Sequence, residues 1–166
     1  MVSPELIRRF PFFAGLESSE IDDLAKLGEA FDAVEGKKLF QEGEDLECLF
    51  LVESGEVGII IEATAQDFKH GVAAQLTGTV KMEDVVVSSA KDGDVFGWSA
   101  LIPPYQATAG VKVLSSKATI VSIDAIGLRK IFEEKPQFGY KMALKIAQVS
   151  RQRLQDSRIE SLASKG

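Results

Sequence analysis

Between about residue 31 and residue 123, the chain consists of short apolar runs separated by turn residues. The runs are rich in β-branched and aromatic residues, and glycine-containing turns recur at roughly the 8 to 12 residue spacing that is typical of a sandwich or barrel. This pattern predicts a mainly β domain, a small β-roll. The predicted strands cover residues 31–34, 38–41, 48–52, 57–61, 84–88, 111–114 and 119–123.

Two short helices are expected before the roll. Ser3 supplies a capping hydroxyl and Pro4 a first helical residue, and the helix that they begin ends by Pro11. The pair Ser18-Ser19 then precedes a second, amphipathic helix that stops near Gly28.

Two further helices are expected after the roll. Asp124 is the predicted N-cap of a short helix, and Pro136 begins a longer one that runs to about Leu162. The predicted division of the chain is therefore N-terminal helices (1–30), the β-roll sensor domain (31–123) and C-terminal helices (124–166).

The long C-terminal helix carries Met142, Ile146, Val149 and Arg153 at alternating spacings of three and four residues. Such a seam packs either on the roll or against a second copy of the helix. A terminal helix of this length is poorly covered by so small a domain, so we expect a homodimer through these four residues.

Composition excludes several classes of function. A net charge of -6 and a pI near 4.9 argue against a protein that binds DNA by neutralising phosphates. The single cysteine, Cys48, is expected to be a buried small hydrophobe in a reducing cytoplasm. No stretch reaches the roughly 18 to 20 apolar residues that cross a bilayer. We therefore expect a cytoplasmic protein without specific DNA or membrane binding.

The sequence offers no arrangement for catalysis or metal binding. Its only histidine, His70, lies in an irregular segment (62–81) that is interpreted as an extended hairpin or a mobile excursion. One histidine cannot build a cupin-type metal site or a nucleophile-histidine pair. We expect no enzyme activity and no bound metal.

The segment from Asp92 to Ile102 is the most informative motif. Gly93 and Gly97 allow tight turns, and a short helical stretch begins near Trp98. The first N–H groups of such a stretch are unpaired and favour an anion. The segment predicts a small anion-binding pocket.

The same segment resembles the phosphate-binding cassette of cyclic-nucleotide-binding domains. Three earlier segments resemble that family in the right order, and the tail is similar to the dimerisation helix of catabolite-activator-type regulators. The resemblance implies a double-stranded β-helix jelly roll with a C-terminal dimerisation helix. The chain ends at Gly166, before any helix-turn-helix, which is a second reason to expect no specific DNA binding. The segments that carry the resemblance are 6–16, 34–44, 49–57, 93–101 and, in the tail, 143–155.

The chain departs from the family at both charged anchors of the cassette. Trp98 stands where the family has the glutamate that binds the ribose, and Ala107 stands where it has the arginine that pairs with the phosphate; a one-residue slip would place Gln106 there instead. Loss of two charge-assisted hydrogen bonds would weaken binding on the order of a hundredfold to ten-thousandfold. The backbone amides from Gly97 to Ala100 remain, so we expect weak cyclic AMP binding or none.

Three residues or pairs have two interpretations. Trp98 either fills the vacated site or core, or provides a stacking surface for a planar ligand. Tyr105 either belongs to a stiff proline loop or closes over a ligand. Ser157 and Arg158 either contact the nucleotide base or are a solvated helix face. The predicted ligand-binding residues are Phe96, Gly97, Trp98, Ser99, Ala100, Leu101, Tyr105, Gln106, Ala107, Thr108 and Ala109.

These patterns favour a stand-alone regulatory sensor domain of the cyclic-nucleotide-binding type. Its candidate ligands are a cyclic nucleotide or another small phosphate-containing effector, and it would signal through dimer contacts or through another regulatory protein. Some sensors of this family carry haem, for which His70 is the one conceivable ligand, although a lone loop histidine more often lies on the surface. The alternative is a degenerate module that binds no ligand and serves only dimerisation or interaction.

Overall fold

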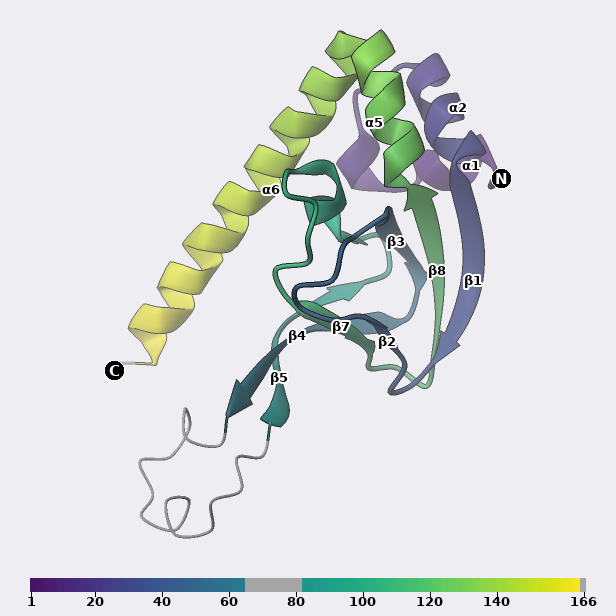
Figure 1. Ribbon diagram of the computed structural model, residues 1–166. Helices are drawn as coiled ribbons and strands as arrows, with labels where there is room; N and C mark the ends of the chain where they lie inside the picture. Colours follow the sequence, from purple (N-terminus) through teal and green to yellow (C-terminus); the bar gives the residue numbers. More distant parts are fainter. Residues whose placement is uncertain (65–81, 165–166) are drawn as a thin grey trace, which may run out of the picture.

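Eight strands form two antiparallel sheets in the computed structural model, which describes residues 1–64 and 82–164 (Figure 1). One sheet has the order β1-β8-β3-β6 and the other has the order β2-β7-β4-β5. The predicted jelly roll with flanking helices is confirmed. The strands are β1 (Gly28–Val34), β2 (Lys38–Phe40), β3 (Cys48–Ser54), β4 (Glu56–Thr64), β5 (Met82–Lys91), β6 (Val95–Phe96), β7 (Gly110–Val113) and β8 (Lys117–Asp124).

The structure corrects the strand limits at three places. β1 begins at Gly28 rather than near residue 31, because Gly28 already pairs with Ile123 of β8. The short strand β6, which pairs with β3, has only two residues and therefore no readable period. Residues 62–64 belong to β4 and not to an irregular excursion, since Glu62 pairs with Asp84 of β5. Residues 65–81, with His70, lie outside the described part of the chain.

The helices are α1 (Pro4–Arg8), η1 (Pro11–Phe13), α2 (Ser18–Lys26), η2 (Trp98–Leu101), α5 (Ala125–Glu134) and α6 (Pro136–Ala163). The Ser3 hydroxyl accepts a hydrogen bond from the Glu5 amide, and the Asp124 carboxylate accepts one from the Ile126 amide, so both expected caps are confirmed. The start of α2 was predicted one or two residues too late. Its N-cap is Glu17, whose amide donates to the carboxylate of Glu20.

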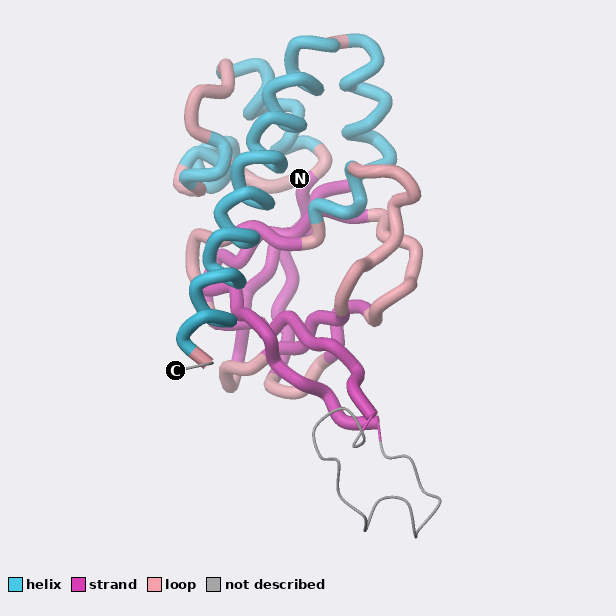
Figure 2. Tube along the Cα trace, turned by 90° about the vertical axis from the view of Figure 1, so that its left-hand side faces the viewer, coloured by secondary structure: helices cyan, strands magenta, loops and turns pink. Residues whose placement is uncertain are grey.

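The hydrophobic core has two parts. One lies between the two sheets, and the other is built by the helices on the outer face of β3 and β8. Helices from both ends of the chain share the second part: Phe10 and Leu24 pack in the same cluster as Leu128 and Phe138. Figure 2 shows these helices gathered at one end of the roll, with α6 running back beside it. The N-terminal and C-terminal helices are therefore one packing unit, although 93 residues of sequence separate the predicted segments 1–30 and 124–166.

Polar contacts hold the N-terminal end of α6 against α2. The carboxylate of Glu20, which is 6% exposed, accepts hydrogen bonds from Lys141 at 3.1 Å. The ammonium of Lys135 lies 2.6 Å from the carboxylate of Asp23. A buried carboxylate needs such a partner, so these contacts set the direction in which α6 leaves the helical layer.

The predicted dimer seam faces the domain itself. Met142 and Ile146 are buried in the chain's own structure, and Val149 and Arg153 are half-buried against it. Met142 and Ile146 therefore have little surface to offer a second copy, and the homodimer itself stays a prediction. The first five turns of α6, as far as Arg153, rest on the domain, and the three-four spacing of their covered residues reflects that intramolecular contact.

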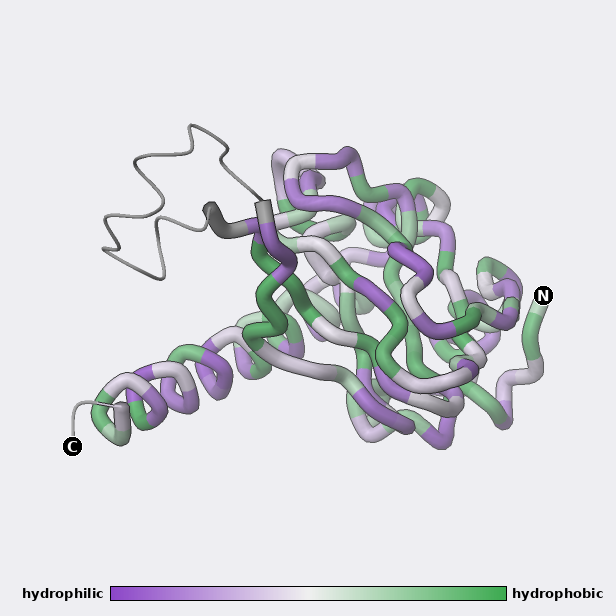
Figure 3. The backbone as a smooth tube through the Cα atoms, turned by 90° about the horizontal axis from the view of Figure 1, so that it is seen from below, coloured by the Kyte–Doolittle hydropathy of each residue, from purple (hydrophilic) through white to green (hydrophobic). Residues whose placement is uncertain are grey.

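The opposite face of α6 carries four exposed apolar side chains, with the exposed Arg151 and Arg158 between them. Tyr140, Leu144, Leu154 and Leu162 are between 46% and 73% exposed. At 3.6 residues per turn, these four side chains fall within an arc of about 80°. Beyond Arg153 every described residue of α6 is exposed, and Figure 3 shows hydrophobic positions on the part of the helix that projects past the roll. Within the described residues, no helix combines the length and the apolar character that a membrane span requires.

Candidate functional site

The site begins at a tight turn between β5 and β6. Gly93 has a φ of +89° and donates its N–H to the carbonyl of Val52 at 2.9 Å. The Asp94 carboxylate accepts a hydrogen bond from the Lys91 amide at 2.9 Å. Gly97 has a φ of +77°, and a Cβ atom there would lie 2.9 Å from Cδ2 of Phe50. Only glycine fits this position without strain, because the backbone is left-handed and the neighbouring ring leaves no room.

The predicted amide cradle is shorter than expected. The stretch that follows Gly97 is a 3₁₀ helix of four residues, η2. The Ala100 amide already donates to the carbonyl of Gly97 at 3.1 Å, and the Ala100 carbonyl accepts from the Arg129 guanidinium at 2.7 Å. Ala100 is therefore held by the fold and is not available to an anion.

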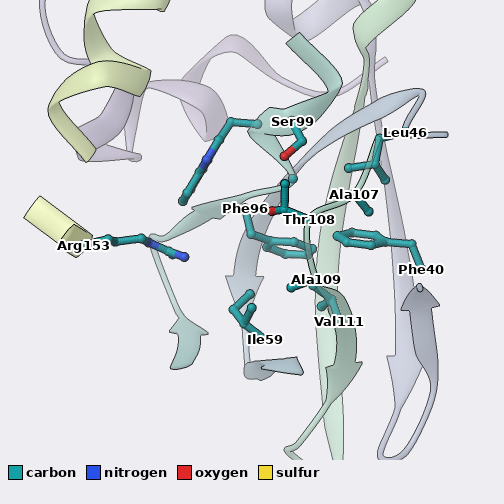
Figure 4. A pocket seen from close by; sticks show the side chains of 12 residues that line it. Phe40, Leu46, Ile59, Phe96, Ser99, Ala107, Thr108, Ala109, Val111 and Arg153 are labelled. Atoms are coloured by element: carbon teal, nitrogen blue, oxygen red, sulfur yellow. The ribbon is translucent and has the colours of Figure 1, made fainter. Parts of the chain in front are cut away.

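A cavity of about 60 Å³ lies next to η2. Its walls come from both sheets, from η2 and from α6 (Figure 4). Seven of the predicted site residues line this cavity: Phe96, Gly97, Trp98, Ser99, Ala107, Thr108 and Ala109. The sequence analysis missed five lining residues in this role: Phe40, Leu46, Ile59, Val111 and Arg153.

The floor of the cavity is aromatic. The rings of Phe40 and Phe96 are stacked at 6.2 Å, and the ring of Phe50 stacks on Phe96 at 5.1 Å. Phe40 and Phe96 belong to different sheets, so their meeting could not be predicted from local sequence. Inward-facing apolar positions on β2, β4 and β7 were the signal available, but that signal marks the whole core equally.

The structure distinguishes Ala107 from Gln106. Ala107 is 4% exposed and its methyl group faces the cavity. Gln106 is exposed, and its amide donates to the Asp45 carboxylate at 3.3 Å. Gln106 was therefore wrongly included among the cavity residues. At the position where the family has the cassette arginine, the cavity wall carries only the Ala107 methyl group.

Comparison with known proteins gave structural matches only. No protein-family model matches the chain, and no curated protein does. A protein from Geobacter metallireducens GS-15, named as a cyclic nucleotide-binding protein, superposes with a TM-score of 0.73 at 25% identity, over 93% of this chain and 99% of that one. A cyclic nucleotide-binding domain from Methylobacillus flagellatus KT gives 0.69 at 17% identity, over 96% and 80%.

The catabolite activator protein of Thermus thermophilus gives a TM-score of 0.62 at 20% identity. The match covers 93% of this chain but only 63% of the Thermus protein. The chain has the cyclic-nucleotide-binding-domain fold. None of these three neighbours is named as an enzyme.

Besides Gln106, three predicted residues do not line the cavity of this cyclic-nucleotide-binding fold. Tyr105 has a φ of +64°, and the Arg129 guanidinium covers its ring at 3.8 Å, so it is held away from the cavity. Ala100 is fully buried, and Leu101 packs against the core. All three fix the cassette in place; their prediction as ligand contacts is not supported by their positions.

Trp98 and Arg153 close the cavity on the side of α6. The Arg153 guanidinium lies 4.4 Å from the centre of the Trp98 ring system, and Trp98 packs against the helical core. Burial lowers the pKa of Arg153, and the charge of Asp94 partly offsets this effect. Trp98 therefore forms the wall of the cavity on the side of α6, and Arg153 covers the Trp98 ring.

A second hollow lies on the other side of the same pair. It has a volume of about 530 Å³ and runs between α6 and the roll. Asp94, Gln152 and Asp156 are among its polar lining residues. Trp98 and Arg153 line both spaces and form the wall between them.

Two remaining predictions concern positions away from the cavity. Ser157 and Arg158 are exposed and line neither space, which agrees with a solvated helix face. Cys48 is half-buried rather than buried, and burial, followed by the charges of Asp124 and Glu47, raises the pKa of its thiol. A raised pKa leaves less thiolate at neutral pH, which is the opposite of a reactive cysteine.

Proposed function

We propose that the chain is a regulatory ligand-sensing domain of the cyclic-nucleotide-binding type with a non-standard cassette. One observation carries this proposal: the cassette cavity is bounded by the roll on one side and by Arg153 of α6 on the other. An occupant would contact both, so binding would alter how the C-terminal helix is held. The ligand class that fits is a small phosphate-containing molecule, because the guanidinium of Arg153 lines the cavity and favours an anion.

The cavity volume sets a condition on the ligand. Pockets for drug-sized ligands have about 300 to 1,000 Å³, whereas this cavity has about 60 Å³. A nucleotide-sized ligand therefore needs Trp98 and Arg153 to move. The adjoining hollow of about 530 Å³ provides the space into which they would move.

A thermal-shift screen tests the proposal directly. A ligand that binds the folded chain raises its stability by mass action, by about 2.7 kcal/mol at a hundred times Kd. We expect at least one phosphate-bearing compound to raise Tm in a saturable way. The panel comprises cyclic AMP, cyclic GMP, cyclic dinucleotides and haem, with adenosine as the uncharged control.

A second candidate function is a degenerate module that binds no ligand. The observation in its favour is that the cavity, which Trp98 and Arg153 bound on the side of α6, has only about 60 Å³. No saturable shift across the panel, with a protein that unfolds cooperatively, would favour this candidate over the sensor.

For either function we propose a homodimer that forms through the exposed face of α6. The alternative is that this face binds another regulatory protein. The face is defined by Tyr140, Leu144, Leu154 and Leu162. Aligned apolar residues on a projecting helix are the pattern of a two-stranded coiled coil. This exposed face takes the place of Met142, Ile146, Val149 and Arg153, which the sequence suggested as the dimer contact.

We expect sedimentation at micromolar concentration to give roughly twice 18.0 kDa. Leu144→Glu with Leu154→Glu should shift the protein to monomer, because two charges would be buried at the seam. Ile126→Glu is the matched control, since Ile126 is 40% exposed on α5 and lies outside α6. A monomeric natural chain, or a dimer that survives both substitutions in α6, would contradict this assignment.

A further inference from the structure

Arg153 is the last residue of α6 that is partly buried against the domain. Every described residue that follows it in the helix is exposed. Its guanidinium extends from α6 over the Trp98 ring and into the wall of the cassette cavity, with Ser99 and Thr108 on the same cavity (Figure 4). The residue at which α6 leaves the roll is thus also the residue of α6 that lines the cassette cavity.

The charge of Arg153 has no direct partner in the described part of the chain. No carboxylate there lies within 4.0 Å of the guanidinium, and no hydrogen bond joins it to another described residue. The Asp94 carboxylate accepts from the Lys91 amide, and the Asp156 carboxylate accepts from the Gln152 side chain. A half-buried guanidinium with no carboxylate in contact, and with the charge of Asp94 acting only from beyond 4.0 Å, is a favourable place for an anion.

Arg153 is also the one charged residue among the described residues that line the cavity. The remaining lining residues provide an aromatic and aliphatic surface and two hydroxyl groups, those of Ser99 and Thr108. An anionic ligand would therefore find its charge complement on α6 and not on the roll. At the position where the family has the cassette arginine, the roll provides only the uncharged Ala107.

We propose that Arg153 is the phosphate-recognising residue of this domain. It would exchange its contact with Trp98 for an ion pair with a phosphate group of the ligand, while the ligand body lies against Phe40 and Phe96. This inference rests on the proposed sensor function. It adds a regulatory consequence: because the counter-ion is on α6, a bound phosphate joins the helix to the roll, and its loss releases the helix beyond Val149.

Trp98 is the only tryptophan in the chain, so its fluorescence reports this site alone. The probes are inorganic phosphate and phenyl phosphate, titrated at constant ionic strength, with phenol as the uncharged control. We expect a saturable change in emission with phenyl phosphate and a weaker one with inorganic phosphate. Phenol should bind at least tenfold more weakly than phenyl phosphate.

Arg153→Met tests the assignment, and Arg151→Met is its matched control. Arg151 is exposed on the same helix and its replacement removes the same charge. We expect Arg153→Met to weaken phenyl phosphate binding about tenfold, a difference of about 1.4 kcal/mol, and Arg151→Met to leave it unchanged. Circular dichroism and thermal shift confirm that each variant is folded and give a second measure of affinity.

Hydrogen exchange provides the test of the regulatory step. With saturating phenyl phosphate, the amides of residues 147–153 should exchange more slowly in the natural chain but not in Arg153→Met. Equal affinities for Arg153→Met and Arg151→Met would overturn the inference, as would the absence of saturable binding by both phosphates. If the natural chain binds an uncharged compound of the thermal-shift panel but no phosphate, the sensor function stands and the role of Arg153 fails.

Discussion

Met142→Ala is expected to lower the free energy of unfolding by about 2 to 5 kcal/mol. Met142 is fully buried and packs in the cluster that joins Phe10 and Phe13 to Leu128 and Phe138. Truncation leaves a cavity among helices from both ends of the chain, which cannot close without moving α6. The loss is a large share of the 5 to 15 kcal/mol typical of a domain, and Tm should fall by about 5 to 15 °C.

Leu144→Ala is the matched control for that substitution. Leu144 lies two residues further along α6, is 46% exposed and faces away from the domain. Its effect should be small at nanomolar concentration and should appear only where the dimer forms, because association adds to stability by mass action. The effect of Met142→Ala should not depend on concentration. A concentration-dependent loss for Met142→Ala would restore the residue to the dimer seam.

The sequence predicted the class of fold because its signals were local. Strand runs separated by glycine turns, the Ser3 cap and the Asp124 cap depend on residues that are neighbours in the chain. The predicted ends of the strands were wrong where pairing with a distant strand decides them. Gly28 reads as a helix stop, yet it is the first residue of β1 because Ile123 is opposite.

The face assignment of α6 failed for a different reason. A three-four apolar spacing indicates that a helix face is covered, but it does not indicate whether the chain's own domain or a second copy covers it. Met142 is covered by residues that lie more than a hundred positions earlier, such as Ile7 and Phe13. The exposed face was harder to recognise because Leu144 and Leu154 are interrupted by polar residues such as Arg151.

The candidate site divides in the same way. The cassette residues from Phe96 to Ser99 and from Ala107 to Ala109 were found because each of the two stretches is contiguous in the sequence. Tyr105 was misplaced because Arg129, on a separate helix, holds its ring. Arg153 was assigned to a dimer helix and not to the cavity, since only the tertiary fold brings α6 to Trp98.

The expected result for cyclic AMP follows from the wall that Ala107 and Trp98 form. We expect the natural chain to bind this nucleotide weakly or not at all in calorimetry. The indole forms part of the wall of a cavity of only about 60 Å³, and Ala107 offers no charge. Tight binding by the natural chain would mean that Arg153 and the η2 amides fully replace the missing anchors.

Trp98→Glu combined with Ala107→Arg should increase cyclic AMP affinity at least about tenfold, which is about 1.4 kcal/mol. Glutamate supplies the acceptor for the ribose hydroxyl, arginine supplies a phosphate counter-ion, and replacement of the indole by a smaller side chain enlarges the cavity. Two charge-assisted hydrogen bonds contribute roughly 1.5 to 3 kcal/mol each. The full sum is not expected, because the new glutamate lies beside Arg153 and would form an ion pair with it in the free protein.

Trp98→Ala separates the two causes in that experiment. It opens the cavity without adding an acceptor, so it should gain much less than the double variant if charge recognition limits binding. Equal gains would show that space alone was limiting, and that Arg153 already supplies the counter-ion. No gain in a folded double variant would show that the walls around Phe40 and Phe96 are shaped for a different ligand, because both anchors and the space would then be present without effect.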